Sequence, residues 1–180
     1  MKKSKTGFLT KNNIGFTVFE IIVVIAIMAI LSLIVFTNYR SGETRNLLRR
    51  AAQKITLDIR SAQSMAMSAK EIEGFPQGVP PGGYGVEFET NRLSYIFYGD
   101  SGNMFYDSSD VLIKEIPLEN GVKICSLSSA PLSINFTPPD PTITFLGGNP
   151  TATITICLEE DESKTKAITI NKAGMIDFVE

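Results

Sequence analysis

The chain has 180 residues, a formal net charge of −2, and neither histidine nor tryptophan. The lack of histidine excludes Ser-His and Cys-His nucleophile pairs and every histidine metal site. Residues 71–180 carry six basic against sixteen acidic side chains, a net charge of −10. This acidic segment argues against nucleic-acid binding, because such binding depends mainly on neutralising phosphates.

A long apolar run begins close to the N-terminus. Residues 21–36 read IIVVIAIMAILSLIVF, in which only Ser32 is polar, and residues 16–36 reach the ~20 residues that a helix needs to cross a bilayer. We therefore predict a hydrophobic helix over residues 16–40 that is buried in a membrane or in a filament.

Glu20 interrupts this apolar run. A carboxylate inside a membrane helix costs ~2.5 kcal/mol or more at full depth and normally persists only when it is paired. Cleavage after Gly15 would free an α-amine on Phe16, close to Glu20 and equally in need of a counter-charge. The alternative interpretation is an uncleaved signal anchor in which Glu20 has no role.

The string Gly15-Phe16-Thr17-Val18-Phe19-Glu20, between a short basic leader and the apolar run, resembles the type III signal of prepilins and pseudopilins. The resemblance implies that a prepilin peptidase removes a leader peptide, residues 1–15, by cutting between Gly15 and Phe16. It also implies that Phe16 is N-methylated and that Glu20 neutralises the N-terminal amine of a neighbouring pilin or pseudopilin subunit.

The same resemblance implies a location. The protein would cross the lipid bilayer of the cytoplasmic (inner) membrane once, with its N-terminus inside and its head outside. An inner-membrane assembly platform would then move it into a periplasmic or extracellular filament.

Residues 41–70 have the pattern of an amphipathic helix. Apolar side chains recur in alternating steps of four and three residues, which places them on one buried face: Leu48, Ala52, Ile55, Ile59, Ala62, Ala66 and Ala69. The stripe predicts packing against a head domain, with Gly42 as a hinge after the apolar helix. Asp58 lies off the stripe and is predicted to be solvated or to face another subunit.

The remaining residues, 71–180, predict a small antiparallel β head. Glycine and proline clusters end the helix, and alternating apolar and polar residues follow in short runs. These runs predict strands over residues 84–88, 93–98, 111–116, 122–127, 132–136, 142–146, 151–158, 166–170 and 175–178. The expected fold class is α+β and pilin-like, a long N-terminal helix packed on this head.

The chain also resembles the GspH/FimT group of minor pilins and pseudopilins. The resemblance lies in the order of helix and head and in three stretches of sequence: Arg50-Ala51-Ala52, Asp58-Ile59-Arg60-Ser61-Ala62 and the closing residues 168–176.

Two further sites have open alternatives in the sequence. Oxygen donors recur at Asp100, Asn103, Asp107 and Asp110, as a calcium loop requires, but a polar turn between strands uses the same residues. Cys125 and Cys157 lie in strand-like runs, out of phase with the isoleucines, and so are predicted to project from the polar strand faces. They could form a disulfide outside the cytoplasm or remain two separate thiols.

We interpret the chain as a structural subunit of a type II secretion pseudopilus or a type IV pilus. We expect no enzyme activity, no cofactor and no metal site. Two alternatives are a DNA-uptake minor pilin, which the acidic head disfavours, and a membrane-anchored β domain that never assembles.

Overall fold

A computed structural model describes residues 15–140, 142–145 and 149–179, with only the backbone described for residues 35–41 and 179. The leader, apart from Gly15, lies outside the described residues. The chain divides into two compact units, Met1–Gly42 and Glu43–Glu180, which we describe separately. Helix α1 (Val18–Met67) contributes to both units, and Gly42, the predicted hinge, lies within it.

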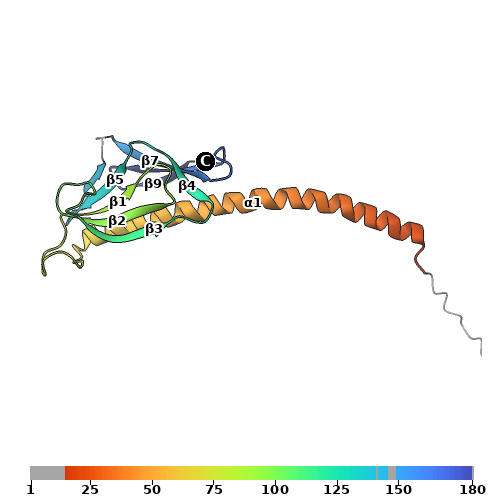
Figure 1. Ribbon diagram of the computed structural model, residues 1–180, viewed down its shortest axis with the longest axis horizontal. Helices are drawn as coiled ribbons and strands as arrows, with labels where there is room; N and C mark the ends of the chain where they lie inside the picture. Colours follow the sequence, from red (N-terminus) through yellow and green to blue (C-terminus); the bar gives the residue numbers. More distant parts are fainter. Residues whose placement is uncertain (1–14, 141, 146–148, 180) are drawn as a thin grey trace, which may run out of the picture. The chain divides into compact units, whose positions relative to one another are not determined.

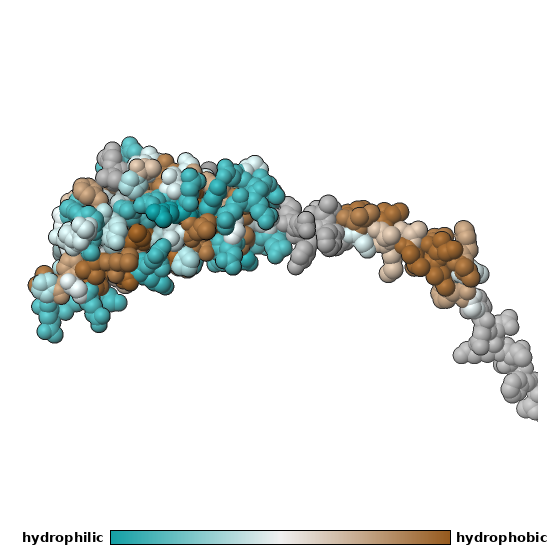
Figure 2. All heavy atoms as spheres, in the orientation of Figure 1, coloured by the Kyte–Doolittle hydropathy of each residue, from teal (hydrophilic) through white to brown (hydrophobic). Residues whose placement is uncertain are grey.

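The first unit presents the apolar run as an exposed helix surface. The large apolar side chains described between Phe16 and Ile34 are 40–77% exposed. Figure 2 shows them as brown spheres along the described part of this segment. Among the described residues, no helix has both the length and the hydropathy of a membrane span. A span over residues 16–36 stays a prediction from the sequence.

In the second unit, α1 packs on two antiparallel sheets (Figure 1). The first sheet has the strand order β3-β2-β1-β5-β6, and the second has the order β4-β7-β8-β9. The nine strands of the described residues are β1 (Gly83–Phe88), β2 (Ser94–Asp100), β3 (Val111–Pro117), β4 (Val122–Leu127), β5 (Leu132–Thr137), β6 (Thr142–Phe145), β7 (Thr151–Leu158), β8 (Thr165–Asn171) and β9 (Ile176–Val179). The predicted α+β class with a helix on an antiparallel head is confirmed.

The helix stripe forms the centre of a single hydrophobic core. Its residues from Leu48 to Ala66 are at most 5% exposed and contact inward-facing residues of both sheets. In the second sheet the inward residues are in register, since Ile156 pairs with Ile124 and Ile154 pairs with Ile168. Because this buried part of the stripe contains three alanines, the helix backbone approaches the sheets closely.

The helix ends earlier than the stripe predicted. Met67 is the last residue of α1, and Ala69 has a φ of 44°, in the left-handed region. The N–H of Lys70 donates to the carbonyl of Met65, and that of Ala69 donates to the carbonyl of Ala66. This pattern of bonds is typical of a helix C-cap, so Ala69 lies beyond the helix and does not extend its buried face.

Polar side chains fasten the helix to the head. The hydroxyl of Tyr95 donates to Asp58, and Nζ of Lys54 donates to the carbonyl of Pro117 at 2.7 Å. Asp58 is partly exposed and also contacts the head, a contact that the prediction of a solvated or subunit-facing side chain did not include. A carboxylate beside the helix stripe can reach a tyrosine hydroxyl of the head, which periodicity alone does not reveal.

The central strands of the first sheet are buried on both faces. All six residues of β1 are buried, and a Cβ added to Gly85 would lie 2.2 Å from Cζ of Tyr98 on the neighbouring strand. The ring of Tyr98 in turn contacts that of Tyr106, which belongs to the loop between β2 and β3. This loop therefore helps to cover the face of the sheet opposite the helix.

Candidate assembly site

The candidate site lies where α1 begins. Gly15, Phe16 and Thr17 precede the helix, and Oγ1 of Thr17 accepts a hydrogen bond from the backbone N–H of Glu20 at 3.2 Å. Thr17 is thus the N-cap, and Thr-x-x-Glu is the pattern of a capping box. The sequence interpretation missed this local role, although the spacing of Thr17 and Glu20 is its signal.

Glu20 therefore combines a local role with a free charge. It lies in the first turn of α1, where the helix dipole favours a carboxylate by about 0.3–1 kcal/mol. Its side chain is exposed, and no described residue forms an ion pair with it. Any cationic partner for this carboxylate would therefore lie outside the described part of the chain.

The other polar side chain of the run is internally satisfied. Oγ of Ser32 donates to the carbonyl of Met28 at 2.7 Å, one helical turn earlier. In an apolar environment this bond removes the cost of an unpaired hydroxyl. Ser32 thus bonds within the helix, whereas the carboxylate of Glu20 forms no ion pair with a described residue.

The calcium candidates form a network of turns. The carboxylates of Asp100, Asp107 and Asp110 each accept hydrogen bonds from backbone N–H groups of the same loop, at 2.6–3.0 Å. Asn103 bonds to Asp107. No three Asp, Glu or Cys side chains of the described residues converge as a metal site would require. These hydrogen bonds are those of a polar turn between strands.

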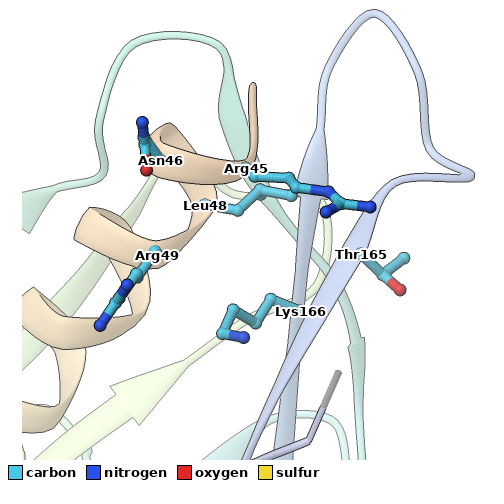
Figure 3. A pocket seen from close by; sticks show the side chains of 6 residues that line it. All are labelled: Arg45, Asn46, Leu48, Arg49, Thr165 and Lys166. Carbon is cyan, nitrogen blue, oxygen red and sulfur yellow. The ribbon is translucent and has the colours of Figure 1, made fainter. Parts of the chain in front are cut away.

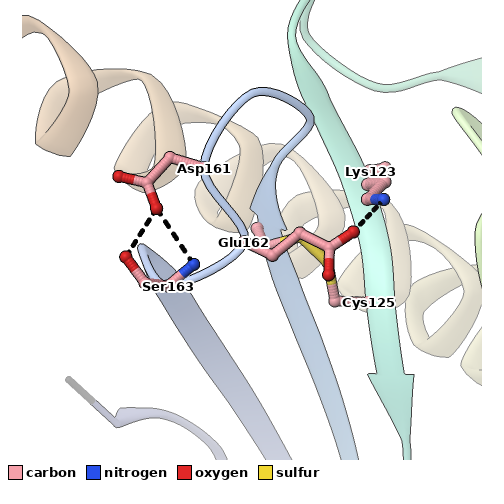
Figure 4. Close-up of polar contacts among 6 residues, drawn as sticks. Lys123, Cys125, Asp161, Glu162 and Ser163 are labelled. Atoms are coloured by element: carbon pink, nitrogen blue, oxygen red, sulfur yellow. Dashed lines mark hydrogen bonds and ion pairs between the residues drawn. A yellow bond between two sulfur atoms is a disulfide. The ribbon is translucent and has the colours of Figure 1, made fainter.

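Cys125 and Cys157 form a disulfide between the neighbouring strands β4 and β7, with their Cα atoms 5.9 Å apart. Cys125 lies at a bulge in β4, where the register with β7 shifts. Cys157 is fully buried, although it alternates along β7 with the inward-facing Ile154 and Ile156, as the sequence predicted. Figure 4 shows the ion pair between Lys123 and Glu162 beside the disulfide.

In the acidic turn at residues 159–162, the side chains of Asp161 and Glu162 have partners within the head. Asp161 accepts hydrogen bonds from the backbone N–H and the hydroxyl of Ser163, and these bonds lower the pKa of Asp161. Glu162 pairs with Lys123. These contacts are those of a turn between strands.

One buried acid had no signal in the sequence. Glu87 is 8% exposed, on the face of β1 opposite the helix. Burial, together with the nearby charges of Glu89 and Asp110, raises the pKa of Glu87 to about 7, although a hydrogen bond from the backbone of Tyr106 opposes this rise. Its burial results from the loop that folds over the sheet.

Comparison with known proteins gives one motif and one set of similar folds. Residues 10–36 match the family model of the prokaryotic N-terminal methylation motif. Two crystal forms of the type IV minor pilin FimU from Pseudomonas aeruginosa strain PAO1 are similar in structure. One has a TM-score of 0.48 and 16% identity, over 76% of this chain and 90% of FimU. The other has a TM-score of 0.46 and 15% identity, over 74% and 93%.

No curated protein matches the chain. The methylation motif covers the capped start of α1 and the exposed apolar run behind it. Over these residues the chain is therefore similar to proteins that carry the prokaryotic N-terminal methylation motif.

Proposed function

We propose that this chain is a minor pilin or minor pseudopilin, a structural subunit of a type IV pilus or a type II secretion pseudopilus. One observation carries the proposal. The methylation motif at residues 10–36 coincides with an apolar helix surface that nothing in the described chain covers. A surface of this kind must be buried elsewhere, because exposed apolar area costs about 25 cal/mol per Å² in water.

Two environments can bury this surface in succession. It is first buried in the inner membrane, with the head on the outer side. In the filament it is buried between the packed helices of other subunits. A prepilin peptidase cuts between Gly15 and Phe16 and methylates the new N-terminus at Phe16. Because Thr17 caps the helix directly after this cut, the mature chain begins its helix almost at once.

Glu20 supplies the pairing step of assembly. Its carboxylate lacks a partner in the described chain, and the α-amine of Phe16 on a neighbouring subunit is a cation in the same apolar layer. Each charge would be costly alone in that layer, so pairing them favours a subunit that docks in the correct axial register.

Processing is tested by mass spectrometry of the protein extracted from cells that contain a prepilin peptidase. We expect an N-terminus at Phe16 with one added methyl group, and retention of the leader after Gly15→Asp. An intact Met1 in such cells would reject the prepilin function.

The role of Glu20 is tested by comparing filament incorporation of Glu20→Gln and Thr17→Ala. Glutamine preserves the shape and the capping-box pattern but removes the charge, so we expect normal cleavage and strongly reduced incorporation. Thr17→Ala loses the cap, worth about 0.5–2 kcal/mol, but keeps the carboxylate, so it should still assemble. Wild-type incorporation of Glu20→Gln would reject the charge pairing, and equal defects in both variants would assign Glu20 to helix capping.

A further inference from the structure

A basic groove lies between α1 and the four-stranded sheet, within the unit Glu43–Glu180. Two hollows of about 380 and 410 Å³ adjoin there, because Arg49 and Lys166 line both of them. Arg45 lines the first hollow, and Gln53 and Phe178 line the second. We use the name basic groove for the surface formed by Arg45, Arg49, Gln53, Lys166 and Phe178.

The groove collects cations from two elements that are far apart in sequence. Figure 3 shows Arg45 extending from the helix toward the strands and Lys166 extending from β8 toward the helix. Arg45 and Arg49 are exposed, and neither forms a hydrogen bond or ion pair with a described residue. Two guanidinium groups are therefore available to an external ligand.

The chemistry of the groove favours a carboxylate ligand with an apolar neighbour. A guanidinium group binds a carboxylate through two parallel hydrogen bonds. Beside these cations the ring of Phe178 is 39% exposed, and its centroid lies 6.0 Å from Nζ of Lys166. A peptide segment that combines acidic and apolar side chains would satisfy both parts of this surface.

Extended polyanions fit less well. Residues 71–180 carry a net charge of −10, so a DNA duplex or an anionic bilayer reaching beyond the groove would meet repulsion from the rest of the head. A short acidic segment contacts the groove alone. We propose that the basic groove binds a carboxylate-rich segment of a neighbouring filament subunit, an inference that rests on the proposed function.

The first test measures binding by the full chain in an uncharged detergent. The probe is a synthetic peptide with the sequence of residues 158–163, Leu-Glu-Glu-Asp-Glu-Ser, carrying an uncharged dye, and the control peptide has Gln and Asn in place of Glu and Asp. We expect anisotropy to detect only the acidic peptide, and its binding to disappear at about 1 M salt, where the Debye length is ~3 Å.

Matched variants locate the binding site. Arg45→Glu combined with Arg49→Glu should weaken peptide binding roughly tenfold or more, the effect expected from losing two exposed ion pairs. Arg50→Glu combined with Arg60→Glu makes the same charge change on exposed residues of the same helix outside the groove, and should have little effect. Equal losses of peptide binding in both double variants would show that the basic groove is not the binding site. Variant-sensitive binding to a DNA duplex or to phosphatidylglycerol vesicles that exceeds binding to the peptide would overturn the proposed ligand.

The second test measures filament incorporation of the same two double variants, after thermal melts have verified their folding. We expect reduced incorporation only for the Arg45 and Arg49 variant. If wild type and both variants assemble equally, the groove inference is wrong while the proposed function stands. If the wild type never joins a filament although the groove binds the peptide, the proposed function is wrong instead.

Discussion

The packing of α1 on the head can be tested at Ile59, which is 1% exposed in the centre of the core. Ile59→Ala removes three carbon atoms, each worth ~0.8 kcal/mol of transfer free energy, or ~2.4 kcal/mol together. The cavity left behind raises the expected loss in unfolding free energy to about 3–4 kcal/mol. A loss of that size is a large part of the ~5–15 kcal/mol that stabilises a typical domain.

Leu57→Ala is the matched control, because it removes the same number of carbons from a side chain of the same helix that is 64% exposed. We expect it to change stability by no more than about 0.5 kcal/mol. The assay is thermal and urea unfolding of residues 43–180, the unit that contains the whole hydrophobic core. Ile59→Ala should lower Tm by roughly 10 °C. Equal, small shifts for the two variants would refute the buried stripe and, with it, the packing of the helix on the head.

Two further predictions concern the head. The pKa of Glu87 is about 7 in the folded chain and near 4.5 in the unfolded chain, so the folded state binds the extra proton and loses stability as pH rises from about 4.5 to 7. Glu87→Gln should therefore be more stable than wild type by about 1–3 kcal/mol at pH 8 and equal to it near pH 4.5 in urea titrations. The exposed Glu160→Gln is the control, and a Glu87→Gln effect that does not vary with pH would contradict the assignment. Cys125 and Cys157 close a loop of 32 residues, so replacing both by serine should cost roughly 3–4 kcal/mol in non-reducing urea melts and make the chain insensitive to dithiothreitol. A wild-type melt that does not respond to dithiothreitol would contradict this prediction.

The sequence by itself determined the features that depend on neighbouring residues. The methylation motif, the apolar run and the helix stripe are periodic or contiguous patterns, so they could be identified without a fold. The nine predicted strands match the nine strands of the described residues with ends that differ by two residues at most. The cap formed by Thr17 and Glu20 is equally local and could have been predicted from the Thr-x-x-Glu spacing.

The tertiary structure decided what depends on strand order. Cys125 and Cys157 meet because β4 pairs with β7, although two other strands lie between them in the chain. Glu87 is buried because a distant loop covers its sheet, and the basic groove exists because β8 brings Lys166 beside Arg45 and Arg49. Each of these contacts joins residues that are far apart in sequence. Local propensity and periodicity do not encode which strands become neighbours, because that choice is made by the packing of the whole core.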